Sequence, residues 1–254
     1  MALAWVAFTT ILHKEIHRFM RIWLQTLVPP VITMSLYFVI FGQLIGSRIG
    51  EMSGFSYMQF IVPGLIMMSS LTNSFSNVAS SFYSTKFAKN VEELLISPTS
   101  PHIILGYVAG GMARGICIGI LVTIVSLFFV SFNIHSWAIV AITLLLTTAT
   151  FALGGLINAV FARSFDDISI IPTFVLTPLT YLGGVFYSIS LLPDFWQIVS
   201  KFNPIVYMIN GFRYGFLGIT DVELSYTFGV LALFILLLYF TVYYLISRGV
   251  GLRS

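Results

Sequence analysis

Charged residues are scarce in this chain: Asp, Glu, Lys and Arg together make up 8% of its 254 residues. Soluble domains carry about 25% charged residues. Hydrophobic residues make up 58% of the chain and aromatic residues 16%, so the sequence has too few polar groups for a water-facing surface. It therefore indicates an all-α membrane protein whose long apolar helices cross the bilayer.

Cysteine and lysine are also rare. The single cysteine, Cys117, lies in an apolar run, which excludes a disulfide framework and a cysteine-based metal site. An ATP-binding P-loop needs a Gly-Lys pair followed by Ser or Thr. None of the four lysines follows a glycine, so we expect the chain to bind no nucleotide and no other cofactor. Its net charge of +3 gives no reason to expect nucleic acid as a partner.

Stretches without charge mark the expected spans, because each holds at least the roughly 20 residues that cross a bilayer. The stretch from Arg114 to Arg163 is about twice as long and is interrupted by a polar turn at 132–136. One transmembrane domain, residues 1–254, is expected. Its six predicted spans are at about 24–46, 58–82, 106–131, 137–161, 168–188 and 225–247.

The positive residues predict the orientation of the bundle. Eight flank the spans on the side of the termini, and three flank them on the other side. Because cytoplasmic loops carry the excess of Lys and Arg, both termini are expected in the cytoplasm. The eight are Lys14, Arg18, Arg21, Lys86, Lys89, Arg163, Arg248 and Arg253; the three are Arg48, Lys201 and Arg213. For Arg114, near the third span, we favour the inner membrane interface over burial beside a carbonyl or acid.

Two segments outside the spans are apolar on part of their surface. Residues 1–23 predict an amphipathic helix in the cytoplasmic interface, and Pro29-Pro30 predicts a bend behind it. Its apolar face would carry Trp5, Phe8, Leu12, Ile16, Phe19 and Trp23, and its polar face Thr10, His13, Lys14, His17, Arg18 and Arg21. The segment 189–222 is broken by prolines and glycines and predicts short extracytoplasmic re-entrant helices that cap the bundle.

The stretch NVEELLISP, residues 90–98, places two adjacent acids after the second span. Asn90 and Glu93 form a capping-box pattern, and both acids suit the first turn of a helix. A capped loop helix is therefore one reading. The other is a docking surface for a partner protein, formed by the apolar cluster 94–96 with the acids at its N-terminal end.

The whole chain resembles the transmembrane subunit of ABC-2 type exporters. The resemblance rests on the order of the interface helix, two spans, the EELL-S-P helix, a GG-x-x-R-G third span and a late block. That block reads LTYLGGVFYSISLLP, then NPIVY, then Arg213. At Leu182-Gly183-Gly184 the chain departs slightly from the L-S-G of many relatives.

This resemblance implies a coupling helix that inserts into a separate cytoplasmic ATPase. The residues of this helix would be Asn90, Val91, Glu92, Glu93, Leu94, Leu95 and Ile96. The resemblance also implies that the interface helix, with Lys14, His17, Arg18 and Arg21, touches the same ATPase. ATP and magnesium would bind to that partner. Two permeases and two ATPases would assemble in the bacterial inner membrane, in contact with its lipids. The cargo expected for so uncharged a chain is amphipathic or lipid-linked.

Other motifs have simpler interpretations beside functional ones. His13 and His17 have metal-ligand spacing with Glu15 between them, but the neighbouring cations disfavour a metal, and we expect none.

Adjacent Asp166 and Asp167 are expected to cap the fifth span, with Arg163 paired to Asp167. The glycines at 106, 110, 111, 115 and 119 predict close helix packing, within the subunit rather than between subunits.

The fifth span contains Pro172 and Pro178 and is followed by Gly183-Gly184. These four residues are kinks in a static bundle and a candidate hinge along the path in a transporter. Uncharged polar residues on the second and fourth spans are expected to bond helices together rather than bind cargo. They are Asn73, Ser74, Ser76, Asn77 and Asn158.

Two other classes of function stay open. An ion-coupled carrier or channel should have ionisable groups in mid-membrane, whereas nearly all charges here lie at the edges of the spans. A membrane-embedded enzyme acting on lipid should have a polar constellation at one membrane face, for which His13, Glu15 and His17 are the only candidates.

Overall fold

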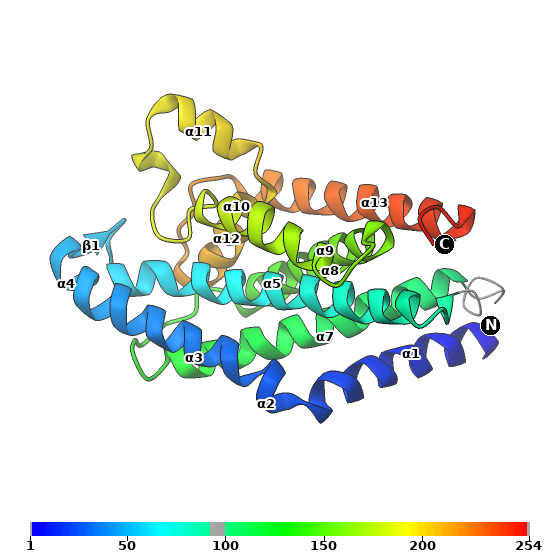
Figure 1. The fold of residues 1–254 in the computed structure, drawn as a ribbon. Helices are drawn as coiled ribbons and strands as arrows, with labels where there is room; N and C mark the ends of the chain where they lie inside the picture. Colours follow the sequence, from blue (N-terminus) through cyan, green and yellow to red (C-terminus); the bar gives the residue numbers. More distant parts are fainter. Residues whose placement is uncertain (1, 92–99, 253–254) are drawn as a thin grey trace.

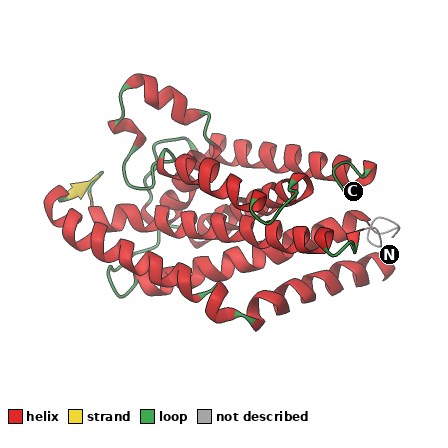
Figure 2. Ribbon diagram, in the orientation of Figure 1, coloured by secondary structure: helices red, strands yellow, loops and turns green. Residues whose placement is uncertain are grey.

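A computed structural model describes residues 2–91 and 100–252, and nearly all of its regular structure is helical (Figure 2). Two two-residue strands, β1 (Glu51–Met52) and β2 (Phe55–Ser56), form a small antiparallel hairpin. The long helices are α1 (Ala2–Arg21), α5 (Tyr57–Phe87), α7 (Ser100–Ser126), α8 (Trp137–Phe161) and α13 (Leu224–Arg248). The shorter ones are α2 (Trp23–Thr26), α3 (Val28–Tyr37), η1 (Phe38–Ile45), α4 (Gly46–Ile49), α9 (Asp167–Ile170), η2 (Ile171–Leu176), α10 (Thr177–Tyr181), η3 (Ile189–Leu191), α11 (Asp194–Lys201) and α12 (Pro204–Leu217).

The long helices lie side by side, and α5 packs against α7, α8 and α12 (Figure 1). Both ends of the chain lie at one end of this bundle, which we call the terminal end. The hairpin and α4 lie at the opposite end, and α11 projects from the bundle. The chain turns at α2, where the prolines of α3 occupy the first turn of the next helix as predicted.

Four helical stretches are long and apolar enough to cross a membrane: Trp23–Ile49, Ile103–Ser126, Trp137–Phe161 and Leu224–Arg248. They correspond to the first, third, fourth and sixth predicted spans. The fourth has the predicted bounds, whereas α7 ends at Ser126 rather than near residue 131. The polar turn predicted at 132–136 lies in the loop that separates α7 from α8.

The second predicted span is α5, which is long enough to cross a bilayer but is not among the helices that qualify by composition. Most of its residues are buried, and they include Ser69, Ser70, Asn73, Ser74 and Asn77. Since its neighbours shield these side chains from lipid, α5 can be polar where a lipid-facing helix cannot.

The fifth predicted span, 168–188, differs in length and form. Its helix runs only from Asp167 to Tyr181, through α9, the π-helical η2 and α10. Pro178 has no N–H to donate, and the preceding Thr177 donates both its N–H and its hydroxyl to the Pro172 carbonyl. A turn with a positive φ at Gly184 follows. The count of six spans remains a prediction.

The segment 189–222 forms η3, α11 and α12. Of these, α12 does not simply cap the bundle but is inserted among α5, α8 and α13, and most of its side chains are buried. Arg213, predicted among the charges outside the spans, is one of the buried residues of α12. Removing it from the charge count leaves eight positive residues against two, so the predicted orientation does not change.

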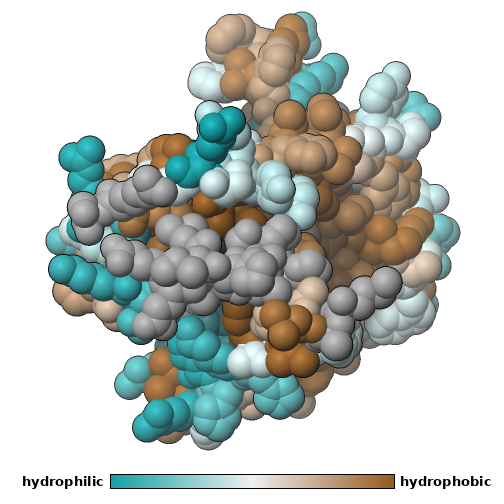
Figure 3. Space-filling model, turned by 90° about the vertical axis from the view of Figure 1, so that its right-hand side faces the viewer, coloured by the Kyte–Doolittle hydropathy of each residue, from teal (hydrophilic) through white to brown (hydrophobic). Residues whose placement is uncertain are grey.

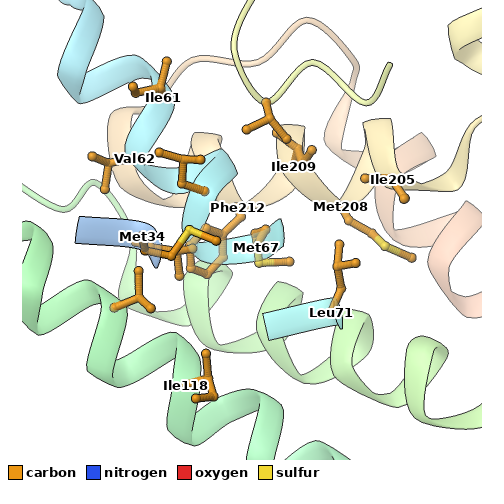
Figure 4. Close-up of a cluster of buried hydrophobic side chains, with 14 of the residues drawn as sticks. Met34, Ile61, Val62, Met67, Leu71, Ile118, Ile205, Met208, Ile209 and Phe212 are labelled. Atoms are coloured by element: carbon orange, nitrogen blue, oxygen red, sulfur yellow. The ribbon is translucent and has the colours of Figure 1, made fainter. Parts of the chain in front are cut away.

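The larger apolar core surrounds α5. Side chains from α3, α5, α7 and α12 meet there, as the close-up shows (Figure 4). The labelled members are Met34, Ile61, Val62, Met67, Leu71, Ile118, Ile205, Met208, Ile209 and Phe212. A second cluster, built around Phe82, Tyr107 and Leu156, lies toward the terminal end. The two clusters hold α5 rigidly along its length.

Candidate functional site

The terminal end brings together the elements that the resemblance assigns to a partner (Figures 1 and 3). It contains the N-terminal part of α1, the end of α5 and the end of the chain. Asn90 is exposed and Val91 is buried. The rest of the predicted coupling helix, Glu92, Glu93, Leu94, Leu95 and Ile96, lies outside the described residues. The root of that segment is therefore placed at this end of the bundle.

A pocket of about 600 Å³ lies beside this root. Three of its lining residues, Lys86, Lys89 and Arg163, are cations, and Tyr83 and Phe87 provide aromatic walls. The ammonium group of Lys86 donates to the carbonyls of Val160 and Ala162 at 2.7 and 2.9 Å, which closes the C-terminal end of α8. Burial, together with the nearby charge of Arg163, lowers the pKa of Lys86.

Helix α1 has three faces rather than the two predicted. Ile11, Glu15 and Phe19, spaced four residues apart, are buried against the bundle. Trp5 and Ile16 are exposed on an apolar face, and Trp23, which begins α2, is exposed as well. His13, Lys14, His17 and Arg21 are exposed on the polar side. Phe19, predicted on the membrane-facing side, is thus a protein contact.

A row of polar contacts joins α1 and α7 to α5. The α5 residues Thr85, Ser81, Asn77 and Asn73 are spaced four apart, which places them on one face of the helix. Thr85 contacts the hydroxyl of Tyr107, which also lies beside Lys14, and Ser81 donates to the carboxylate of Glu15. Asn77 accepts from the guanidinium of Arg18, and Asn73 accepts from that of Arg114. We call this row the polar ladder.

The ladder changes the interpretation of Arg18 and Glu15. The polar face of α1 predicts that Arg18 points to lipid, but its Nη2 donates to Asn77 and to Glu15. Glu15 is fully buried and faces α5, away from the exposed His13 and His17. These three residues do not converge, and no group of metal-ligating side chains occurs in the described ranges. These residues therefore do not form the constellation that the alternative of a membrane-embedded enzyme would need.

Arg114 is packed against neighbouring helices, and whether it also lies at the inner interface, the favoured expectation, stays a prediction. It lies within the bundle, where its Nη2 donates to the Asn73 side chain at 3.0 Å and to the Thr26 carbonyl at 3.3 Å. This is the alternative in which a carbonyl serves as partner. Buried Asn73 provides one acceptor for the guanidinium group.

The glycines of α7 allow this close packing. A Cβ at Gly106 or Gly110 would overlap Ile11 or Glu15 of α1, and a Cβ at Gly111, Gly115 or Gly119 would overlap α5 or α8. All five thus serve packing within the subunit, as predicted. The interhelical role predicted for polar residues is confirmed at Ser74, which donates to the Thr148 carbonyl, and at Asn158, which donates to the Ile168 carbonyl.

The acids after α8 act on the backbone. Asp167 Oδ2 accepts the N–H groups of Arg163 and Ser164 at 2.8 and 3.1 Å, so it bonds the main chain of Arg163. The predicted pairing of Arg163 with Asp167 is therefore made through the backbone N–H of Arg163 rather than through its guanidinium group. Asp166 occupies the N-cap position of α9 but makes no capping bond with its side chain. The backbone bond from Arg163, followed by those from Ser164, lowers the pKa of Asp167.

The candidate hinge residues fall into two settings. Pro172 and Pro178 lie in the outer-facing helix formed by η2 and α10, where Phe174 and Tyr181 are exposed. Gly183 and Gly184 are buried in the turn that follows. The Gly184 carbonyl accepts a hydrogen bond from Arg213 at 2.6 Å, which fixes this turn against α12.

An aromatic cluster connects this region to the first span. Phe186 packs against Phe41, Tyr37 and Tyr181 with ring centroids 4.6, 6.2 and 5.7 Å apart, and the two tyrosine hydroxyls lie 3.4 Å apart. Tyr37 ends α3, Phe41 lies in the π-helical η1, and Tyr181 ends α10. This cluster could not be predicted, because its residues come from two segments that are far apart along the chain.

The long apolar helices and the polar contacts between them define a helical membrane protein. The chain belongs to the ABC-2 type transporter family, whose model matches residues 6–217.

Relatives agree with this assignment. The chain is 68% identical, over the full length of both proteins, to the inner membrane transport permease YadH of Escherichia coli K12. It is 27% identical to nodulation protein J of Rhizobium leguminosarum bv. viciae, over 84% of this chain and 81% of that protein. Nodulation protein J of Sinorhizobium fredii is also 27% identical, over 75% of this chain and 72% of that one.

Proposed function

We propose that this permease is the membrane-spanning subunit of an exporter that is driven by a separate ATP-binding-cassette ATPase. Two copies of the chain and two ATPases, which bind ATP and magnesium, form the working complex. It lies in the bacterial inner membrane with both termini in the cytoplasm, and its cargo is amphipathic or lipid-linked. Membership of the family and the 68% identity to a protein named as an inner membrane transport permease support this proposal.

The observation that carries the proposal is the composition of the terminal end. One end of the bundle contains the start of α1 and Val91, where the predicted coupling segment begins. It also contains the cations Lys86, Lys89 and Arg163. A cytoplasmic protein that docks there would contact the interface helix and the coupling segment at once. The excess of positive residues at this end supports its cytoplasmic location.

Contacts within the described bundle support transmission of a docking signal. Helix α1 is bonded to α5 through the polar ladder, and α5 packs along α7, α8 and α12. A displacement of α1 or of the coupling segment would therefore act directly on α5. The aromatic cluster at Phe186 and the exposed apolar side chains of η2 and α10 suit an amphipathic cargo rather than an ion.

A pull-down of the tagged chain tests the proposal. The chain is extracted in mild detergent and, separately, in nanodiscs, and co-purifying proteins are identified by mass spectrometry against a tagged membrane protein of unrelated fold. A stoichiometric partner that contains a P-loop and shows magnesium-dependent ATPase activity is the expected result. Recovery of the chain alone in both preparations would refute the separate-ATPase proposal and leave the carrier alternative.

A further inference from the structure

The polar ladder contains more positive than negative charge. Arg18 and Arg114 both reach α5, and Glu15 is the one acid that contacts either of them within residues 2–91 and 100–252. Both oxygens of Glu15 are used, one by Ser81 and one by Arg18. The partners of Arg114 are a neutral amide and a neutral carbonyl. Charged residues in a membrane mark functional sites, and here one positive charge of the pair has no acid to balance it among the described residues.

The two arginines are close together and fixed. Arg18 is bonded to Asn77 and Arg114 to Asn73, and these two asparagines lie one turn apart on α5. Four residues of helix rise about 6 Å. Guanidinium groups anchored to residues one turn apart can both donate to the oxygens of a single tetrahedral anion, and arginine favours phosphate because its planar fork matches the geometry.

Each guanidinium still has donors to offer. Arginine has five N–H groups, and only the Nη2 group of either arginine finds acceptors among the described residues. Both Nε atoms are buried without an acceptor, and so is the amide nitrogen of Asn77. The side chain of Arg18 is one third exposed, and Arg114 is partly exposed. The pair is thus anchored on the inside through Nη2 and can be reached from the outside at Arg18.

The surroundings match the level of lipid headgroups. Trp23, 51% exposed, and Ile22 follow α1 at the turn into α2, and Arg21 is exposed beside them. Tryptophan next to basic residues is typical of the membrane–water interface. Exposed apolar side chains also occur on α2, α3 and α7, and α3 packs against α7. They include Leu24, Ile32, Ile120 and Ile124. Acyl chains can lie along these residues while a headgroup meets the arginines.

We propose that Arg18 and Arg114 together bind one phosphate group, supplied by a membrane phospholipid at the turn between α1 and α3. The phosphate neutralises the excess charge of the ladder and joins α1 to α7 through both guanidinium groups. This site does not depend on an ATPase partner, so it can be tested on the purified permease alone.

The first experiment uses the wild-type chain in a glycoside detergent. Native mass spectrometry measures the binding of dioleoylphosphatidylglycerol, dioleoylphosphatidylcholine and dioleoylglycerol, which share acyl chains but differ in the phosphate. One tightly bound copy of each phospholipid, with dioleoylglycerol at least about tenfold weaker, is expected. Equal binding of all three would overturn the proposal. Displacement of the phospholipid by millimolar inorganic phosphate would assign the site to free phosphate and overturn the lipid source.

The second experiment uses Arg18→Gln and Arg114→Gln, with Arg21→Gln on the same helix and Arg48→Gln at the opposite end as controls. Each ladder variant should bind phospholipid at least about tenfold more weakly, because a charge-assisted hydrogen bond is lost, and the controls should bind normally. Thermal unfolding without lipid checks that the variants fold. If a ladder variant does not fold, the comparison of phospholipid with dioleoylglycerol decides alone. Unchanged binding in folded ladder variants would overturn the proposal.

Discussion

Arg213 donates a hydrogen bond of 2.6 Å to the carbonyl oxygen of Gly184, and its guanidinium lies 3.8 Å from the ring centroid of Phe60. The arginine comes from α12, the carbonyl from the turn after α10, and the ring from α5. Three segments far apart in the sequence are thus joined by one side chain that is 1% exposed. This contact gives Arg213 a structural role at the end of the bundle opposite the termini.

Replacing Arg213 should therefore destabilise the permease strongly. Arg213→Ala leaves the Gly184 carbonyl without its partner and opens a cavity beside Phe60, for a loss on the order of 3 kcal/mol. Arg213→Lys keeps the charge but cannot reproduce the planar fork, so a smaller loss is expected. Thermal unfolding in detergent measures both, with exposed Arg248→Ala as the control. Equal midpoints for all three variants would contradict this role.

Gly110 should tolerate no side chain. A Cβ there would overlap the Cβ of Glu15, whereas a Cβ at Gly229 of α13 meets nothing within 4 Å. Gly110→Ala must push α1 away from α7, and the expected cost is about 1–3 kcal/mol. Gly229→Ala adds a better helix former and should leave stability unchanged or slightly raised. The two alanine variants are compared by thermal unfolding, and the prediction fails if they unfold at the same temperature.

The acids of the predicted coupling helix should act in partner capture. Under the proposed function, replacing Glu92 and Glu93 by alanine should reduce ATPase recovery in the pull-down by about tenfold, because charges that orient a docking surface are lost. The permease itself should keep its thermal stability. Glu51→Ala, in the hairpin at the opposite end, is the matched control. Unchanged recovery of the ATPase would leave the two acids with a capping role only.

Asp167 should make stability depend on pH in the acid range. Hydrogen bonds from the backbone of Arg163 and from Ser164 hold the pKa of Asp167 below its ordinary value. The unfolded chain therefore binds more protons than the folded one below about pH 4. The contribution of Asp167 is present above that range and is lost as the pH falls through it.

This pH dependence can be measured with Asp167→Asn. At neutral pH the variant should unfold at a lower temperature than the wild type, and the difference should shrink as the pH is lowered past 4, roughly the ordinary pKa of the group. Asp166→Asn is the control, since Asp166 makes no capping bond with its side chain. A difference that stays constant across this pH range would show that the charge of Asp167 plays no part.

The bounds of a span could be predicted where the sequence itself marks both ends. The fourth span, 137–161, matches α8, because its apolar run begins after the polar turn at 132–136 and ends before Arg163. The fifth was predicted seven residues too long at its end, since an apolar composition does not show that Gly183 and Gly184 form a turn held by Arg213. The burial of α12 was not predicted, because its glycines, proline and arginine are typical of a loop or a cap.

Part of the candidate site was visible in the sequence. The four-residue spacing of Asn73, Asn77, Ser81 and Thr85 could have predicted one polar face on α5. Their partners could not be predicted, because Arg18 and Arg114 belong to helices whose relative position depends on Gly106 and Gly110. Similarly, Glu15 interrupts the apolar stripe of Ile11 and Phe19, and that interruption signals a buried acid with a polar partner.

The polar surface of α5 has a consequence for how the chain enters the bilayer. A helix with serines and asparagines along its length, and too little apolar surface to qualify as a span by composition, gains little from partitioning into lipid alone. Asn73, Ser74 and Asn77 find partners on α1, α7 and α8, and α7 and α8 are synthesised after α5. Stable insertion of α5 into the membrane therefore depends on α7 and α8, which leave the ribosome later, and is complete only once the bundle has assembled.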